Sequence, residues 1–148
     1  MCQQHSGFIG RYAGAIVLAL LACLSSLQTA HAAFTVPPND GFVTDEVNLL
    51  KPDEKAQLTA ELERYKSDTS NEIAVLIINS LNGEILEDAA LKTLRTWGIG
   101  DEKKDNGILI VIVYADRKIR IEVGYGLEGA VTDSTAVGVA EKDMQPNF

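Results

Sequence analysis

The sequence predicts a single small α/β domain in which helices pack on the faces of a mixed β-sheet. The first indication is the order of the expected elements, α-β-α-β-β-α, because helices between strands favour a layered α/β arrangement. The second is the short connection between the last two strands, which favours an antiparallel hairpin. The third is a continuous apolar run in two of the strands, which is typical of strands buried on both faces.

The chain begins with a segment, residues 1–32, that is typical of an export signal and precedes the domain. Arg11 stands before the apolar stretch 13–24, which is too short to cross a bilayer comfortably, and the small residues that follow predict cleavage before Ala33. We therefore expect the protein in the periplasm or cell envelope. Two alternatives stay open, a lipoprotein signal at Cys23 and an uncleaved membrane anchor.

Removal of this leader would limit the chemistry of the mature chain. Both histidines, His5 and His31, and both cysteines, Cys2 and Cys23, lie in it. A mature domain without His or Cys excludes a Ser-His-Asp triad, a Cys-His pair, the usual zinc sites and disulfides. The formal net charge of the whole chain is −8, which argues against a nucleic-acid partner.

The elements of the domain follow in order. Residues 33–41, with two consecutive prolines, predict an extended arm or linker, and the domain proper is expected over 42–148. Residues 41–47 fit a short edge strand or a loop. A helix is expected from Pro52, because proline suits the first helical turn and the acidic residues after it suit the positive end of the helix dipole.

The middle of the chain predicts a strand, a helix and a second strand. Residues 73–78 form an apolar, β-branched run, and residues 85–97 carry an apolar stripe that ends at Gly98, a natural stop. Residues 108–113 are the most apolar strand and are therefore expected at the centre of the sheet.

The last part of the domain predicts the hairpin strand and a third helix. Residues 118–123 alternate strictly between polar and apolar, as expected of a half-exposed strand. A helix is expected over about 134–144, capped by Asp133 or Ser134.

A glycine-rich segment, 124–129, matches the pattern G-x-G-x-x-G of dinucleotide-binding loops. That fingerprint requires the start of a βαβ unit, whereas this segment closes a hairpin strand. Glu128 lies inside the glycine turn and Asp133 lies beyond it, and such carboxylates repel phosphate and attract hard cations. Nucleotide binding is therefore the least favoured interpretation.

Two loops that are distant in sequence are expected to meet at one edge of the sheet. In an antiparallel pair the start of one strand lies beside the end of the other, which brings 105–107 next to 124–133. A parallel strand at 73–78 would add Asn71 and Glu72 to the same edge. Four oxygen-bearing side chains can then face one concavity: Asp105, Asn106, Glu128 and Asp133.

These ligands predict a divalent-cation site for Ca²⁺ in preference to Mg²⁺. The structural alternative is that Asp105-Asn106-Gly107 is only a turn and that Asp133 only caps the last helix.

Three motifs together resemble the TPM domain family over about residues 42–148. They are Trp97-Gly98-Ile99-Gly100, Asp105-Asn106-Gly107 and Gly124-Tyr125-Gly126-Leu127-Glu128. The resemblance implies an exported or thylakoid-lumenal α/β domain that binds a divalent ion. It assigns to the ion the four residues named above and adds Asp45, from the segment that leads into the domain.

The same resemblance implies two functions. One is a non-catalytic accessory role in an envelope or membrane protein complex. The alternative is a metal-assisted phosphomonoesterase acting on a small phosphorylated molecule. Members of the family continue beyond a segment like Pro146-Asn147-Phe148, so the domain is expected to be incomplete at its C-terminus, and a membrane tether would lie in the missing segment.

Overall fold

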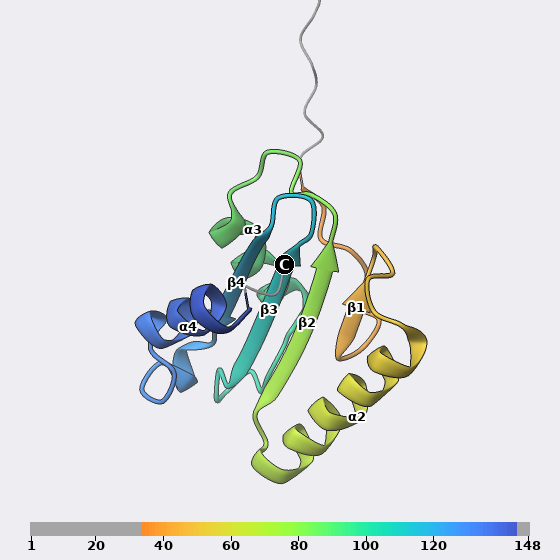
Figure 1. Cartoon of the computed structure of the whole chain (residues 1–148). Coiled ribbons are helices and arrows are strands. Elements are labelled where there is room, and N and C mark those ends of the chain that lie inside the picture. The colour runs from red at the N-terminus through yellow and green to blue at the C-terminus, as the bar shows by residue number, and fades with distance from the viewer. Residues whose placement is uncertain (1–33, 145–148) are drawn as a thin grey trace, which may run out of the picture. The chain divides into compact units, whose positions relative to one another are not determined.

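The computed structural model describes residues 34–144, which contain a four-stranded sheet with the strand order β1-β2-β3-β4 (Figure 1). The first three strands are parallel and β4 is antiparallel to β3. The strands are β1 Val43–Asp45, β2 Glu72–Ile78, β3 Gly107–Val113 and β4 Lys118–Val123. The predicted mixed sheet and its hairpin are therefore confirmed, whereas the predicted leader lies outside the described residues.

The helices follow the order expected from the sequence, and their bounds are α2 Pro52–Thr69, α3 Leu86–Trp97 and α4 Asp133–Val139, with a π-helical turn at Ala140–Met144. The backbone N–H of Lys51 donates to Glu54 Oε2 (2.9 Å) at the start of α2. This bond and the nearby Lys51 ammonium hold the pKa of Glu54 below its ordinary value. Helix α3 ends at Trp97 and is capped by Gly98, whose φ of 62° is left-handed, as the sequence predicts.

The cap of α4 differs from the prediction. The N-cap residue is Thr132, whose hydroxyl oxygen accepts a hydrogen bond from the backbone N–H of Thr135 (3.3 Å). Asp133 is instead the first helical residue, where its charge suits the helix dipole. The prediction of Asp133 or Ser134 as the cap was wrong by one or two residues, because all three side chains are typical caps and sequence alone does not rank them.

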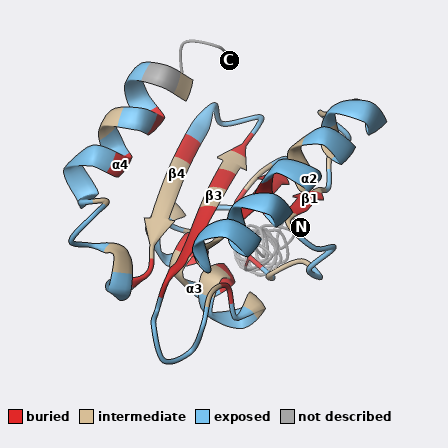
Figure 2. Cartoon of the chain, turned by 90° about the horizontal axis from the view of Figure 1, so that it is seen from below, coloured by how far each residue is buried: buried red, intermediate tan, exposed pale blue. Residues whose placement is uncertain are grey.

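The sheet is covered on its two faces by different helices. Leu76 and Leu109 belong to the apolar core on the α3 side, whereas Val75 and Ile77 pack with Leu62 of α2. The alternation follows from the two-residue period of a strand. Figure 2 shows that β3 is buried along most of its length and that the outer sides of the helices are exposed. The predicted central position of this strand is confirmed.

In this arrangement the two crossover connections, β1-α2-β2 and β2-α3-β3, have opposite handedness. The strand order β1-β2-β3 does not reverse, yet α2 joins β1 to β2 on one face and α3 joins β2 to β3 on the other. One of the two connections must therefore be left-handed, which departs from the strong right-handed preference of parallel units. As a result, the chain leaves the carboxyl ends of the neighbouring strands β1 and β2 toward opposite faces.

The N-terminal arm of the described chain packs into the domain. Phe34 belongs to the α3-side core and is 5% exposed. Lys92 Nζ donates to the carbonyl of Phe34 (3.2 Å), and Trp97 Nε1 donates to the carbonyl of Pro37 (2.8 Å). These contacts make the segment an integral wall of the domain. Within residues 34–144 no helix combines the length and apolar character that a membrane crossing requires.

Candidate functional site

Three loops meet at the edge where β2 and β3 begin and β4 ends, as the sequence predicts. Glu72 is paired with Gly107, and Ile108 is paired with Val123, so the strand ends lie side by side. We call this the amino-terminal edge. It consists of the loops 70–72, 98–107 and 124–128, which Figure 1 shows at the end of the sheet opposite the β3–β4 connection.

The glycine-rich segment packs directly on the backbone of the loop before β3. The N–H of Gly126 donates to the carbonyl of Asp105 (3.0 Å), and that of Gly124 donates to the carbonyl of Gly107 (2.7 Å). A Cβ atom on Gly126 would lie inside 3.0 Å of the carbonyl oxygen of Lys104, a separation that real Cβ atoms essentially never show. Close approach of two backbones therefore explains both glycines.

This contact also separates the segment from a dinucleotide-binding loop. Residues Tyr125–Leu127 form a single 3₁₀ turn after a hairpin strand, where the fingerprint would require the opening of a helix in a βαβ unit. The carbonyl groups of Lys104 and Asp105 lie against the glycines, where a pyrophosphate would have to approach.

A second pair of glycines, Gly100 and Gly107, allows a further close approach between backbone segments of this edge. A Cβ on Gly100 would lie 2.5 Å from the backbone nitrogen of Gly107, and one on Gly107 would collide with the carbonyl group of Ile99. Gly100 also has a φ of +94°, which disfavours any other residue. The three loops of the edge are thus layered backbone against backbone.

Asn106 holds this stack together from inside and is 4% exposed. Its Oδ1 accepts from the N–H of Asp101 (2.8 Å), and its Nδ2 donates to the carbonyl of Ser70 (2.7 Å) and to Asn71 Oδ1 (3.2 Å). The backbone carbonyl of Asn106 accepts from Glu72 (3.1 Å). These bonds give both polar atoms of the Asn106 side chain a hydrogen-bond partner without a bound ion. The role of Asn106 in this structure is therefore to join the loops.

Glu72 is a component of the edge that sequence reasoning named only as a neighbour. Its Oε2 accepts from the N–H of Gly100 (2.9 Å) and forms an ion pair with Lys66 Nζ (2.8 Å). The same ammonium lies 5.6 Å from the centroid of the Phe42 ring. The sequence signal that could have indicated this role is the position of Glu72, the one charged residue of an otherwise apolar strand, at its first position.

The remaining predicted ion ligands are divided between different places. Asp105 and Glu128 are exposed and lie on adjoining loops of the amino-terminal edge. Asp133 lines a small cavity of about 150 Å³ together with Ile121 of β4. Asp45 lies at the carboxyl end of β1, at the other end of the sheet, where its side chain accepts from the N–H groups of Val47 and Leu50 at 3.2 and 2.9 Å.

Across the described residues, no group of three or more His, Cys, Asp or Glu side chains is arranged to hold a metal ion. A cation at the amino-terminal edge would therefore have to take some of its oxygen ligands from backbone carbonyls, side-chain amides or hydroxyls, or water, as Ca²⁺ commonly does. The divalent-cation site stays a prediction.

The most exposed large apolar side chain at this edge is that of Tyr125, at 79%. It stands between Gly124 and Gly126, both of which are held against the neighbouring loop. Because the backbone on each side is fixed, the aromatic ring is displayed from a rigid base. Tyr125 was absent from the sequence-based candidates, although its position between two glycines of one motif could have indicated it.

An open pocket of about 430 Å³ adjoins the edge. Six residues line it: Lys66, Ser70, Glu72, Gly100, Asp101 and Lys104. Two ammonium groups, a hydroxyl and two carboxylates thus share one concave surface.

Comparison with known proteins places this fold in a recognised group. The model of the TPM domain matches residues 43–148. A solution NMR structure of the N-terminal domain of a protein from P. gingivalis has 38% sequence identity and a TM-score of 0.67, and the alignment covers 72% of this chain and 68% of that one. No curated protein matches this chain.

Two further solution structures share the fold at lower identity. The N-terminal domain of cg2496 from Corynebacterium glutamicum has 18% identity and a TM-score of 0.54, with 70% of this chain and 68% of that one covered. BA42 from the psychrophilic bacterium Bizionia argentinensis has 23% identity and a TM-score of 0.52, with 61% of each chain covered.

Proposed function

Because the chain belongs to the TPM domain family, we propose that it is an exported, non-catalytic accessory module that presents its amino-terminal edge to a protein of an envelope or membrane complex. The observation that carries this proposal is the display of Tyr125, 79% exposed, from loops braced by backbone contacts. Exposed tyrosines on rigid loops are frequent anchors of interfaces, because they bury a large area at a low cost in side-chain entropy.

Co-purification tests this role. The protein, produced from its full coding sequence in its native host with a tag, is recovered from envelope extract. We expect Tyr125→Ala to lose the specific partner while its unfolding curve stays unchanged, because an exposed ring contributes little to folding. Ile85→Ala is the matched control, since Ile85 is also exposed, at 60%, but lies at the start of α3. Equal recovery with both variants would contradict the proposal.

We extend the proposal to a divalent cation, Ca²⁺ in preference to Mg²⁺, held near Asp105 and Glu128. The two carboxylates are exposed on loops joined by the bond from Gly126 to Asp105, so an ion between them would stiffen the surface that carries Tyr125. A ligand that binds only the folded state stabilises it by about 2.7 kcal/mol at a concentration 100 times its Kd.

Calorimetric and thermal titrations with CaCl₂ and MgCl₂ test the ion. We expect heat of binding and a higher Tm with Ca²⁺, both lost in the double variant Asp105→Asn/Glu128→Gln. The double variant Glu63→Gln/Asp116→Asn removes the same charge from exposed positions elsewhere and should keep both effects. Absence of a Ca²⁺-dependent heat and of a Tm shift in the unaltered protein would exclude the ion. The proposal that Tyr125 contacts a partner would not be affected by that result.

A second candidate function, metal-assisted hydrolysis of a phosphomonoester, is favoured by the pocket beside the edge. Lys104 supplies positive charge for a phosphate and Ser70 supplies a hydroxyl, whereas the Lys66 ammonium is already paired with Glu72. An aryl phosphate assayed with Ca²⁺, Mg²⁺ or Mn²⁺ from acid to neutral pH would then be hydrolysed. Lys104→Gln should raise KM, whereas Lys103→Gln, one residue away and outside the pocket lining, should leave KM unchanged. Lack of turnover in every condition would remove this candidate.

A further inference from the structure

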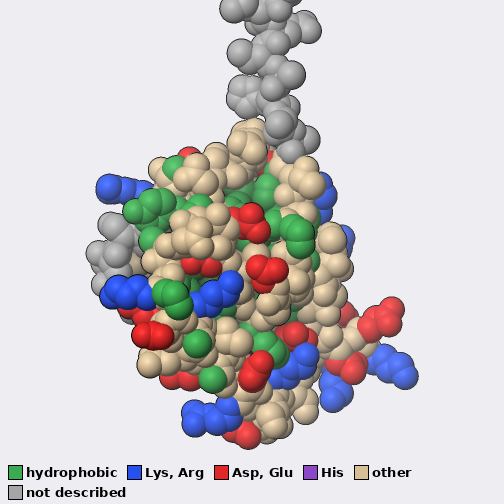
Figure 3. Space-filling view, turned by 90° about the vertical axis from the view of Figure 1, so that its right-hand side faces the viewer, with side chains coloured by type: hydrophobic (Ala, Val, Ile, Leu, Met, Phe, Trp, Pro, Cys, Tyr) green, Lys and Arg blue, Asp and Glu red, His purple; other side chains and the backbone are tan. Residues whose placement is uncertain are grey.

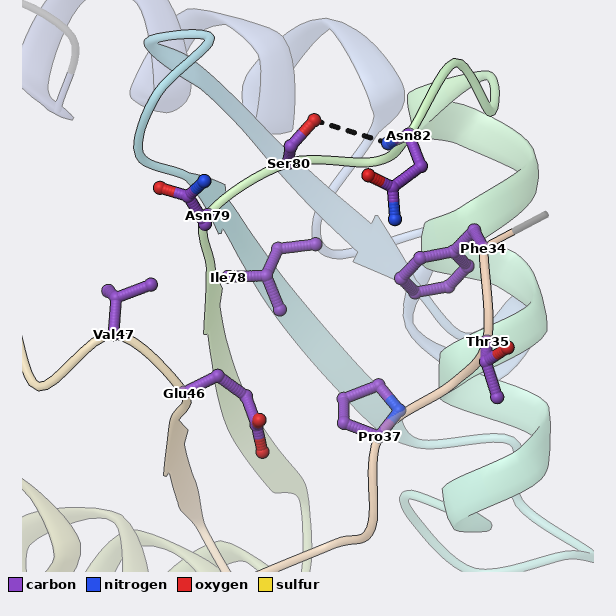
Figure 4. A pocket seen from close by; sticks show the side chains of 9 residues that line it. All are labelled: Phe34, Thr35, Pro37, Glu46, Val47, Ile78, Asn79, Ser80 and Asn82. Atoms are coloured by element: carbon purple, nitrogen blue, oxygen red, sulfur yellow. Dashed lines mark hydrogen bonds between the residues drawn. The ribbon is translucent and has the colours of Figure 1, made fainter. Parts of the chain in front are cut away.

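A second concave surface lies at the opposite end of the sheet from the amino-terminal edge. We call it the carboxyl-end crevice. It is an open cavity of about 470 Å³, within the size range of small-molecule and side-chain binding pockets. Figure 4 shows its lining, with Ile78 in the centre of the view; the lining residues are Phe34, Thr35, Pro37, Glu46, Val47, Ile78, Asn79, Ser80 and Asn82.

The topology of the sheet explains why a crevice forms here. Glu46 and Val47 directly follow β1, and Asn79 and Ser80 directly follow β2. The chain leaves β1 toward α2 on one face and leaves β2 toward α3 on the other, so the two connections diverge between neighbouring strands. In open α/β sheets, ligands bind at such a point, outside the carboxyl ends of the parallel strands. The N-terminal arm, fixed by the carbonyls of Phe34 and Pro37, closes one side.

The lining combines an apolar base with hydrogen-bonding groups. Ile78, Val47 and the Pro37 ring provide aliphatic surface. Among the described residues, the side chains of Glu46, Asn79 and Asn82 have no hydrogen-bond or ion-pair partner. These groups can therefore bind a ligand without first breaking a bond within the protein.

The charge of the lining selects the ligand. Glu46 is its single ionisable side chain, and no Lys or Arg contributes to the described surface of the crevice. Figure 3, which views the β1 side of the molecule, shows acidic and hydrophobic side chains next to one another in its upper half. A carboxylate beside aliphatic surface favours a cation on an apolar stem and disfavours an anion such as phosphate.

We propose that the carboxyl-end crevice binds a lysine or arginine side chain of a protein partner. The cationic head would pair with Glu46, the aliphatic stem would lie on Ile78, Val47 and Pro37, and the amides of Asn79 and Asn82 would bond the backbone of the partner. This site is separate from the surface in the proposed function, because it lies at the carboxyl ends of β1 and β2 and shares no residue with the amino-terminal edge.

The test is an NMR titration of the ¹⁵N-labelled protein, expressed from its full coding sequence, with N-acetyl-lysine amide. N-acetyl-norleucine amide is the matched probe, because it keeps an aliphatic stem but lacks the charge. We expect the amide signals of Asn79, Ser80 and Asn82 to shift with a Kd on the order of 1 mM, and the neutral probe to bind at least about threefold more weakly. Equal binding of both probes, or shifts confined to other parts of the domain, would overturn the proposal.

Two variants distinguish the contribution of the Glu46 charge to binding from the contribution of the cavity itself. Glu46→Gln should weaken the lysine probe by roughly two- to fivefold and leave the norleucine probe unchanged, as expected of an exposed ion pair. Glu63→Gln removes the same charge from an exposed position of α2 and should change neither. Asn79→Trp, at an exposed residue of the lining, should block both probes while the remaining spectrum stays dispersed. A lysine affinity that survives both Glu46→Gln and Asn79→Trp would refute the assignment.

Discussion

Replacing Gly126 by alanine tests whether backbone contact explains the glycine-rich segment. A Cβ at this position would lie inside 3.0 Å of the Lys104 carbonyl oxygen and at 3.0 Å from its carbonyl carbon. Both atoms belong to backbone, so no side-chain rotation can relieve the clash. The loops 98–107 and 124–128 would have to separate, and the hydrogen bond from Gly126 to the carbonyl of Asp105 would be strained or lost.

The expected cost follows from two terms. Forcing an additional carbon into a tightly packed contact costs about 1–3 kcal/mol. Loss of a backbone hydrogen bond adds about 0.5–1.5 kcal/mol. We therefore expect Gly126→Ala to lower the free energy of unfolding by roughly 1.5–4.5 kcal/mol, a large share of the roughly 5–15 kcal/mol of a typical domain.

Urea unfolding followed by circular dichroism measures this cost as a shift in the midpoint at constant m. Gly129→Ala is the matched control, because it lies in the same segment and a Cβ there meets nothing within 4 Å. We expect that variant to stay within about 0.5 kcal/mol of the original or to gain up to about 1 kcal/mol. Equal stability of the two variants would refute the explanation of the motif by close approach.

Three other changes test the amino-terminal edge, the N-terminal arm and the cap of α4. Asn106→Ala should lower stability by about 2–4 kcal/mol in urea unfolding, because it leaves the Ser70 carbonyl and the Asp101 N–H without their bonds; a loss under about 1 kcal/mol would contradict the joining role. Phe34→Ala should cost about 3–5 kcal/mol in thermal unfolding, and an unchanged Tm would show that the arm is not part of the core. Thr132→Ala should cost about 1 kcal/mol, whereas a larger loss from Ser134→Ala would assign the cap to Ser134.

The sequence predicted the fold well because its local signals agree. The apolar run before Asn79, the proline at the start of α2 and Gly98 after α3 each match a single element. Strand pairing also followed from general rules, since the short connection at Ala115 allows only an antiparallel pair. The side of the sheet that each helix covers could not be derived, because the usual rule of hand would place α2 and α3 on one face.

The candidate site was predicted less completely, for a physical reason. Strand order determines which loops meet, so the approach of Asp105 to the glycine-rich segment was foreseeable. Side-chain direction within a loop depends on dihedral angles that one sequence does not specify. Asn106 therefore points inward to Ser70 and Asp101, and Tyr125 points outward, although both lie in motifs read correctly as loops.

The most direct test of the accessory role is photo-crosslinking in living cells. Tyr125 is replaced by p-benzoyl-phenylalanine, an aromatic residue that keeps the ring on the braced loop and reacts only with groups in contact. We expect a discrete crosslinked species from position 125 on irradiation that does not form from Ile85, which is also exposed but lies at the start of α3. No adduct at position 125, or the same adducts from both positions, would contradict the proposal that the amino-terminal edge is a partner surface.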